Sequence, residues 1–301
     1  MAEPPDVSRP RRPTPAQVRR RRAVALTIVV LAVAAAIVAV AVALPHATRD
    51  AAPTTTVLPP PPKPFRVVFP EGFTRTQKAQ RVQAVAKIAE RKKRKPVRIS
   101  RSTYLAATRT PAVPCFTPHT RTKVEGFLFP ATYDFLAKTT SKQLVGQQLV
   151  AFCRNWKKVD LAYARSKNLT PYDVLTIASL IQGEAVVASD GPKIAAVIYN
   201  RLHLRMPLGI DAALRYALDI PGTESIHQSQ LQNPTPYNLR LHTGLPPTPI
   251  DNPGLAAMQA AAHPAKVDYL YFVAKPDKRH HFFTASASEF QRYLCDHGYG
   301  C

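Results

Sequence analysis

Residues 170–201 read TPYDVLTIASLIQGEAVVASDGPKIAAVIYNR, and the rest of the chain is best understood from this stretch. It predicts two successive helices. At the start of the first helix, Thr170 fits the N-cap, Pro171 the first helical position and Asp173 the acidic member of a capping box. Asp190 is expected to cap the second helix.

One acid, Glu184, falls near the end of the first of these helices. Three apolar residues share its face by helical spacing: Ile177, Leu180 and Ile181. A carboxyl group beside apolar side chains is partly desolvated, which raises its pKa and lets it hold a proton at neutral pH. The same pattern also fits a structural acid paired with Lys193 or Arg201, and the pattern by itself does not separate the two.

The composition points to a polyanionic partner. The chain has 301 residues, a formal net charge of +22 and a pI of about 10.2. Its length allows one or two domains with appendages. A basic excess of this size indicates nucleic acid, an anionic membrane or acidic polymers of a cell wall. The four cysteines have neither CxxC spacing nor paired histidines, so no zinc site is predicted.

Residues 23–44, AVALTIVVLAVAAAIVAVAVAL, contain neither charge nor proline. About 22 helical residues span roughly 33 Å, which is enough to cross a bilayer. A cleaved secretory signal is the alternative, although its apolar region is usually only about 7 to 15 residues long. We therefore expect a transmembrane helix. The basic, Pro-rich residues 1–22 are expected to form a disordered cytoplasmic tail.

This topology places the remainder of the chain outside the cell membrane, so a nucleic-acid partner is not expected. Residues 45–64 are rich in Pro and Thr and predict a semi-rigid linker. The remainder is of the α+β class. Residues 65–130 predict a small module, and residues 131–301 predict a larger, helix-rich domain.

Elements within these two parts follow from periodicity and capping. In the small module, strands are expected at 65–69 and 124–129 and helices at 74–91 and 100–107. In the larger domain, further helices are expected at 142–160 and 255–262, and a β-hairpin from 268–274 and 280–285. In that hairpin, His280 and His281 fit strand or surface positions better than metal ligands.

Residues 87–101 hold eight Lys or Arg residues against a single acid, Glu90. Two interpretations stay open. The segment is either a solvated helix end or a contact for an anionic wall polymer.

Cysteine thiols exported from the cell tend to oxidise. Cys295 and Cys301 can close a short terminal loop, and Cys115 and Cys153 then join the small module to the larger domain. This pairing is a hypothesis, since four cysteines allow three connectivities.

Five motifs follow one another in chain order: EGFLFPATYDF (125–135), LTIASLIQGEA (175–185), VIYNRLHLRMPLGIDAALRYAL (197–218), TPYNLRLHTGLPPTPIDNPG (235–254) and YLYFVA (269–274). Together they resemble the endolytic murein transglycosylase family, the MltG or YceG-like proteins, over about residues 65–294. The resemblance implies a LysM-like module and an α+β catalytic domain behind one N-terminal membrane anchor.

The resemblance also implies an activity. The family cleaves the β-1,4 bond between N-acetylmuramic acid and N-acetylglucosamine without water, leaving 1,6-anhydro ends. One acid can suffice, because the sugar's own C6 hydroxyl is the nucleophile, whereas ordinary glycosidases use two carboxylates. The family's catalytic glutamate maps onto Glu184. No metal or organic cofactor is implied. The implied partners are peptidoglycan glycan strands and, since the enzyme acts on nascent strands, peptidoglycan synthases.

Seven further positions are candidate substrate contacts: Glu125, Tyr199, Asn200, Arg201, Asp211, Tyr237 and Asn238. Three of them have structural alternatives, since Glu125 can link the modules, Arg201 can pair with Glu184 and Asp211 can cap a helix at 212–218. The chain departs from the family's pattern at Gln182, where many members have a second acid, and at 209–213. A catalytically inactive scaffold that binds peptidoglycan with the same fold is the main alternative function.

Overall fold

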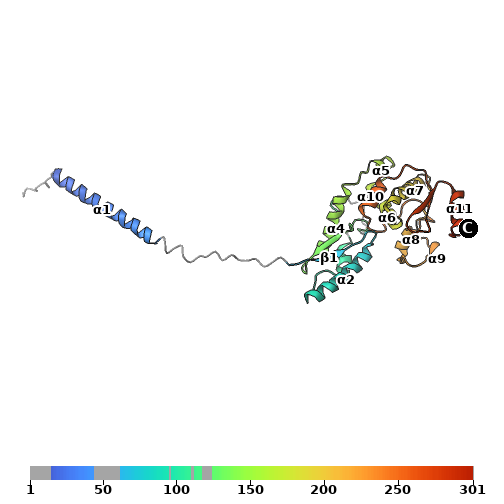
Figure 1. The fold of residues 1–301 in the computed structure, drawn as a ribbon, viewed down its shortest axis with the longest axis horizontal. Helices are drawn as coiled ribbons and strands as arrows, with labels where there is room; N and C mark the ends of the chain where they lie inside the picture. Colours follow the sequence, from blue (N-terminus) through green and yellow to red (C-terminus); the bar gives the residue numbers. More distant parts are fainter. Residues whose placement is uncertain (1–14, 44–61, 95, 110–111, 117–123, 301) are drawn as a thin grey trace, which may run out of the picture. The chain divides into compact units, whose positions relative to one another are not determined.

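The computed structural model describes residues 15–43, 62–94, 96–109, 112–116 and 124–300. The chain divides into two units, residues 1–61 and 62–301. Figure 1 shows their helices and strands.

The first unit contains the helix α1 (Pro15–Ala43). Its segment Arg19–Ala41 has a mean hydropathy of 3.0 and is long and apolar enough to cross a membrane. Residues 15–22 are helical, so the prediction that they belong to a disordered tail is wrong. Once an apolar helix is nucleated, the good helix formers Ala, Gln and Arg extend it at little cost. The rest of the predicted tail and residues 44–61 lie outside the described residues.

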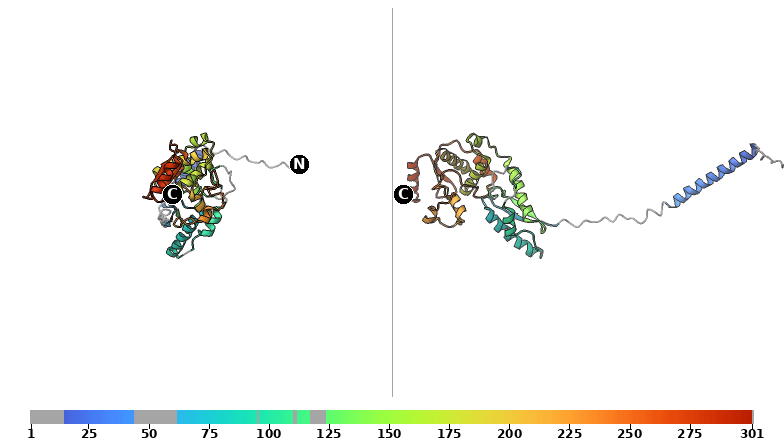
Figure 2. Two further views of the ribbon diagram at one scale, coloured as in Figure 1. Left: turned by 90° about the vertical axis from the view of Figure 1, so that its right-hand side faces the viewer. Right: turned by 180° about the vertical axis from the view of Figure 1, so that it is seen from behind.

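The second unit begins with a small α+β arrangement: β1 (Phe65–Val68), α2 (Arg75–Lys93), α3 (Arg101–Ala107) and β2 (Thr132–Phe135). The helix-rich part follows: α4 (Ser141–Trp156), α5 (Ala162–Ser166), α6 (Pro171–Glu184), the 3-10 helix η1 (Ala188–Asp190), α7 (Gly191–His203), α8 (Asp211–Leu218), α9 (Gln228–Leu231) and α10 (Leu255–Ala262). The unit ends with β3 (Tyr271–Ala274), β4 (His281–Thr284) and α11 (Ala287–Asp296). Within this unit, α2 and β1 lie at the opposite end from α11 (Figures 1 and 2).

The predicted closing strand at 124–129 is wrong. β1 instead pairs antiparallel with β2, with Phe65 opposite Phe135 and Val68 opposite Thr132. Residues 124–128 form a buried turn, in which Gly126 has a φ of +90°. The segment is apolar because it is enclosed by other parts of the unit, and an enclosed turn has the same composition as a buried strand.

A single cluster of buried side chains runs through both parts of the second unit. It includes Val67 of β1, Phe152 of α4 and Leu180 of α6. Residues 62–301 therefore form one compact unit, and β2 lies beyond the boundary that we drew at residue 130.

The disulfide between Cys115 and Cys153 confirms the predicted pairing of these two residues. It joins the segment after α3 to α4. Cys295 is also disulfide-bonded, and Cys301, its predicted partner, lies outside the described residues.

α6 is the central helix of the helix-rich part. Every residue from Val174 to Ile181 is buried, and the helix packs against α7, α8 and α10. The predicted capping box is present, since Thr170 accepts from the backbone N–H of Asp173 and the Asp173 carboxylate accepts from the backbone N–H of Thr170 at 2.8 Å. The predicted helix at 255–262 is confirmed as α10.

Asp190 stands at the N-cap of α7, but its side chain makes no capping hydrogen bond, contrary to our expectation. Its carboxylate accepts the backbone N–H of His281 at 2.8 Å and lies 3.0 Å from Nδ1 of the same residue. Both side chains are buried. The carboxylate of Asp190 therefore bonds to His281 and not to the helix end, and this pair attaches the predicted hairpin, confirmed as β3–β4, to the start of α7.

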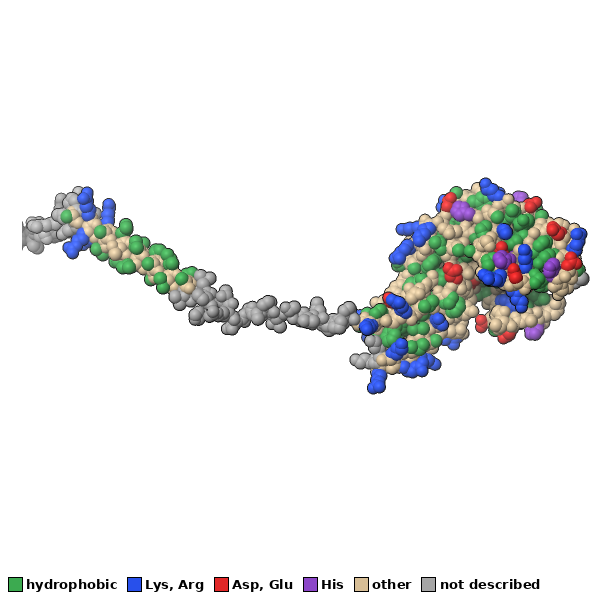
Figure 3. Space-filling model, viewed as in Figure 1, with side chains coloured by type: hydrophobic (Ala, Val, Ile, Leu, Met, Phe, Trp, Pro, Cys, Tyr) green, Lys and Arg blue, Asp and Glu red, His purple; other side chains and the backbone are tan. Residues whose placement is uncertain are grey.

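Basic side chains gather around the end of α2 (Figure 3). Lys87, Arg91, Lys92 and Arg98 are all exposed there. Their exposure fits both interpretations of residues 87–101, and the wall-polymer contact stays a prediction.

Candidate functional site

Glu184 is the last residue of α6 and is half-buried. The three apolar residues predicted to share its face, Ile177, Leu180 and Ile181, are buried in the core. The rigid central helix therefore holds the carboxyl group at the boundary between the core and the surface.

The N-terminus of α8 meets this carboxyl group. The backbone N–H of Ala212 donates a hydrogen bond to Glu184. Burial raises the pKa of Glu184 to about 7, and the negative charge of Asp211 also raises it. The Ala212 hydrogen bond and the charge of Arg215 act in the opposite direction. A carboxyl group that titrates near neutral pH can both give and accept a proton there.

The structural alternative for Glu184 required a partner in Lys193 or Arg201. Lys193 instead lies 4.0 Å from Asp190, and its Nζ is 5.4 Å from the centroid of a Phe ring. Arg201 donates hydrogen bonds to three backbone carbonyls, those of Pro207, Leu208 and Leu270. Neither cation pairs with Glu184 in the part of the chain that the structure describes.

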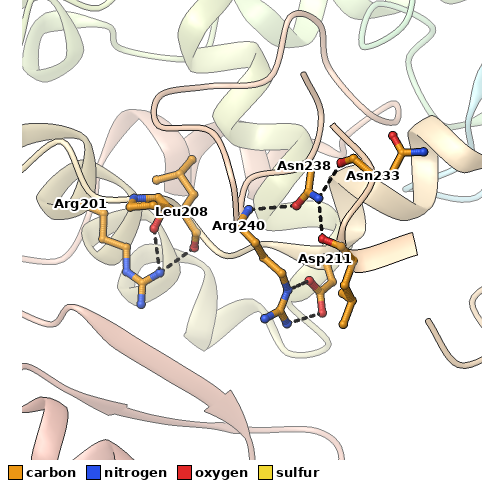
Figure 4. A network of polar contacts seen from close by, with 8 residues as sticks. Arg201, Leu208, Asp211, Asn233, Asn238 and Arg240 are labelled. Atoms are coloured by element: carbon orange, nitrogen blue, oxygen red, sulfur yellow. Dashed lines mark hydrogen bonds and ion pairs between the residues drawn. The ribbon is translucent and has the colours of Figure 1, made fainter. Parts of the chain in front are cut away.

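Asp211 is the first residue of α8 and does not cap it, so the capping alternative is wrong. Its carboxylate accepts two hydrogen bonds from Arg240, at 2.6 and 2.8 Å (Figure 4). The planar guanidinium matches both carboxylate oxygens, which holds the acid beside Glu184 in one orientation.

Asn238 shapes the loop that carries Arg240. It is fully buried, and its amide nitrogen donates to the carbonyls of Leu231 and Asn233, both at 2.8 Å. Its oxygen accepts the backbone N–H of Arg240 at 3.2 Å (Figure 4). The neighbouring Tyr237 bonds through its hydroxyl to Thr248 at 2.8 Å.

Tyr199 and Asn200, two further candidates on α7, form hydrogen bonds with backbone carbonyls of other segments. Tyr199 donates its hydroxyl to the Ala261 carbonyl at 2.9 Å. Asn200 donates to the carbonyls of Val267 and Tyr269. These contacts hold the chain before β3, and a contact of these residues with substrate stays a prediction.

Glu125 joins three parts of the unit. Its carboxylate accepts the backbone N–H of Arg75 at the start of α2, at 2.9 Å, and the side-chain amide of Asn252 at 2.7 Å. The Tyr216 hydroxyl of α8 lies 3.4 Å away. Burial raises the pKa of Glu125 to about 7, while these hydrogen bonds and the nearby Arg75 and Lys78 lower it. The geometry matches the linking role that we considered for this acid.

Several polar residues at this junction escaped the sequence analysis. Lys78 of α2 is fully buried and donates to the Leu128 carbonyl at 2.6 Å. Asp251 and Asn252 are buried in the Pro-rich segment, where the sequence pattern predicted no role for them. A signal was present, because an Asp-Asn pair between prolines is unusually polar for a segment that otherwise packs inward.

Replacing Asn252 by Ala should lower the free energy of unfolding by about 2–4 kcal/mol. Asn252 accepts the backbone N–H of Leu128 at 2.8 Å and donates to Phe73 and Glu125, so the change leaves buried groups unpaired. Urea unfolding followed by the fluorescence of Trp156, the single tryptophan, measures it. Asn233, which is only half-buried and accepts one backbone N–H, is the matched control and should lose about 1 kcal/mol or less. Equal losses for the two variants would contradict the prediction.

A cavity of about 230 Å³ lies next to the end of α6, with Gly183, the residue before Glu184, in its wall. Its lining residues come from the start of α2, the end of α6, α8 with the segment after it, and the Pro-rich segment: Gly72, Thr74, Thr76, Gln77, Gly183, Ala212, Arg215, Tyr216, Asp219, Ile220, Gly222, Ile250 and Asp251. Polar groups, one aromatic ring and two Ile side chains converge there, as in sites for polar ligands. Among the described residues, no three His, Cys, Asp or Glu side chains are grouped as a metal site requires.

Residues 44–295 match the model of the YceG-like family, and the chain belongs to this family. A Bacillus subtilis (strain 168) protein named endolytic murein transglycosylase is 34% identical over 216 residues, covering 70% of this chain and 59% of that protein. A protein of the same name from Streptococcus pneumoniae (strain R6) is 32% identical over 246 residues, covering 77% of this chain and 44% of that protein. These matches confirm the resemblance seen in the five motifs.

The chain spans about half the length of these curated relatives. The crystal structure of a YceG-like protein from Listeria monocytogenes has a similar fold. The two structures superpose with a TM-score of 0.63 at 29% sequence identity. The match covers 76% of this chain and 75% of the Listeria chain.

Proposed function

We propose that this protein is a membrane-anchored endolytic lytic transglycosylase that cuts peptidoglycan glycan strands. The observation that carries the proposal is Glu184, a half-buried acid whose pKa is raised to about 7, at the end of the buried helix α6. The names of its relatives in Bacillus and Streptococcus support the same reaction. The βααβ arrangement around α2 and α3 is then the LysM-like module, and α1 is the anchor with its N-terminus in the cytoplasm.

The reaction needs one group that first gives and then takes a proton. Glu184 protonates the glycosidic oxygen as the bond to the muramic acid C1 breaks. The C6 hydroxyl of the same sugar then attacks C1, and the Glu184 carboxylate accepts its proton. The products are a free 4-hydroxyl and a 1,6-anhydro ring, so no water is consumed. Cleavage beside the membrane would end nascent strands during wall biogenesis, next to the synthases that make them.

The test is digestion of purified peptidoglycan by the full chain in detergent, followed by mass spectrometry of the fragments. We expect fragments with 1,6-anhydro-muramyl ends released from within strands. Hydrolysed, reducing ends would refute the lytic reaction. Binding of peptidoglycan by folded protein without any cleavage would favour the non-catalytic scaffold.

The pH profile of this activity tests the role of Asp211. Because the first step needs protonated Glu184, the rate should fall as pH rises through about 7, where this carboxyl loses its proton. Asp211→Asn removes a negative charge that raises the pKa of Glu184, so the falling limb should move to lower pH. The control is Asp134→Asn on β2, where Asp134 forms an exposed ion pair with Arg66 of β1; this change should leave the falling limb in place. A limb that moves equally in both variants would contradict this role.

A further inference from the structure

Asp251 is a buried acid that the proposed reaction does not use. It lies in the lining of the cavity beside Glu184 and is only 5% exposed. The lining extends from exposed residues, among them Gln77, Gly183 and Asp219, to the buried Ile250 and Asp251. The cavity therefore leads from the surface to this carboxyl group.

The two oxygens of Asp251 face different surroundings. Oδ2 lies 3.8 Å from the position that a Cβ would take on Gly72 and 3.9 Å from the corresponding position on Gly183, and both glycines line the cavity. Oδ1 is buried without a hydrogen-bond partner among the residues that the structure describes. Because Oδ1 is itself shielded, Oδ2 is the oxygen that a group bound in the cavity can reach, and a partner there would offset part of the cost of burying this carboxyl group.

The surroundings of Asp251 favour its neutral form. Burial raises the pKa of Asp251 well above its ordinary range, and the nearby Glu125 and Glu71 raise it further, while Lys78 lowers it. A neutral carboxyl group carries an O–H donor. The complementary ligand atom is therefore an acceptor, such as a carbonyl oxygen.

We propose that Asp251 donates a hydrogen bond to the carbonyl oxygen of an acetamido group seated in this cavity, which makes it a specificity-determining residue. The proposal rests on the proposed function, in which the substrate is a strand of N-acetylated sugars. The methyl end of an acetamido group can contact Ile220 and Ile250, which also line the cavity. At about 230 Å³ the cavity is smaller than typical ligand pockets and suits one substituted ring.

The location of the cavity connects this contact to the reaction. Gly183, in the cavity wall, directly precedes Glu184, and Ala212, also in the wall, donates its N–H to Glu184. A ring held by Asp251 thus lies next to the acid that cleaves the strand.

The test measures binding without turnover, using the full chain in detergent with the Glu184→Gln substitution. Soluble glycan strands are prepared with and without enzymatic N-deacetylation, and dissociation constants are measured by calorimetry. With Asp251 present, the N-acetylated strands should bind about tenfold more tightly, the effect of one buried hydrogen bond. Asp251→Leu, which is also branched at Cγ but has no donor, should reduce this preference to about twofold or less, and Asp251→Asn, which keeps an N–H donor, should retain most of it.

Other causes of a preference for N-acetylated strands give results that differ from those expected for Asp251. Repulsion between the basic protein and the free amines of deacetylated strands would persist in Asp251→Leu, and such persistence overturns the proposal. Equal binding of both strands by the protein with Asp251 also overturns it, and this comparison needs no variant at position 251. Strands with stem peptides removed must show the same preference. A preference that disappears with the stems also overturns the proposal, because the acetamido group alone would then not produce it.

The two proposals fail separately. If the unsubstituted protein cleaves no peptidoglycan, the proposed function falls, yet the acetamido preference can still be measured. If cleavage yields anhydro ends without an acetamido preference, only the role of Asp251 is lost. Urea unfolding monitored by Trp156 verifies that each variant is folded, and Asp251→Ala replaces Asp251→Leu if the latter is not.

Discussion

Replacing Glu184 by Gln is expected to reduce the formation of anhydro-ended fragments by about 10³-fold or more. The amide has nearly the same shape as the carboxyl group but can neither give a proton to the leaving oxygen nor accept one from the C6 hydroxyl. Because one residue performs both steps in the proposed reaction, a single substitution removes the acid and the base together. Fragment release by full chain and variant, quantified by mass spectrometry at equal protein concentration, measures the effect.

The control for this variant is Glu224→Gln, an identical change at an exposed position, which should leave the activity unchanged. Stability supplies a second control. The folded pKa of Glu184, about 7, lies above its ordinary 4.5, so wild-type stability falls as pH rises between these values. The Gln side chain does not ionise. Relative to wild type, the variant should therefore be more stable at pH 8 than at pH 4. Residual activity near the wild-type level would refute the catalytic role of Glu184.

Replacing Gly126 by Ala is expected to lower the free energy of unfolding by about 2–5 kcal/mol, a large part of the stability of an ordinary domain. Two effects add. Gly126 has a φ of +90°, a conformation that is strained for any residue with a Cβ. An added Cβ would also lie 2.8 Å from Cβ and Cγ of Pro249 and 3.2 Å from the Leu175 side chain, none of which can move freely in the core.

Gly146 offers a matched control, because the same substitution should have the opposite sign there. It lies within α4, and an added Cβ meets no atom within 4 Å. Gly146→Ala should raise stability by up to about 1 kcal/mol through helix propensity. Urea unfolding observed through Trp156 measures both variants. Similar effects of the two substitutions would contradict the enclosed-turn structure at 124–128.

The sequence predicted those elements that are determined by residues close together in the chain. The capping box at Thr170, the apolar face of α6 and the apolar length of α1 depend on residues a few positions apart, so they could be recognised without the fold. The strand predicted at 124–129 failed because apolar composition reports burial and not backbone conformation. The groups that shift the pKa of Glu184 likewise lie on α8, and no spacing rule connects this helix to the end of α6.

From the sequence alone, the helix at 170–184, its acid Glu184 and the family motifs could be identified, because each depends on short-range spacing or on a recognisable pattern. The tertiary structure decided what surrounds that acid. Only the packing of α8 against α6 sets the Ala212 N–H and the charge of Asp211 beside Glu184, and Arg240 reaches Asp211 from another loop. The packing of the Pro-rich segment brings Asp251 to the cavity that Gly183 and Ala212 also line. Desolvation and Coulomb interactions depend on distance in space, and these distances exist only once distant segments have folded together.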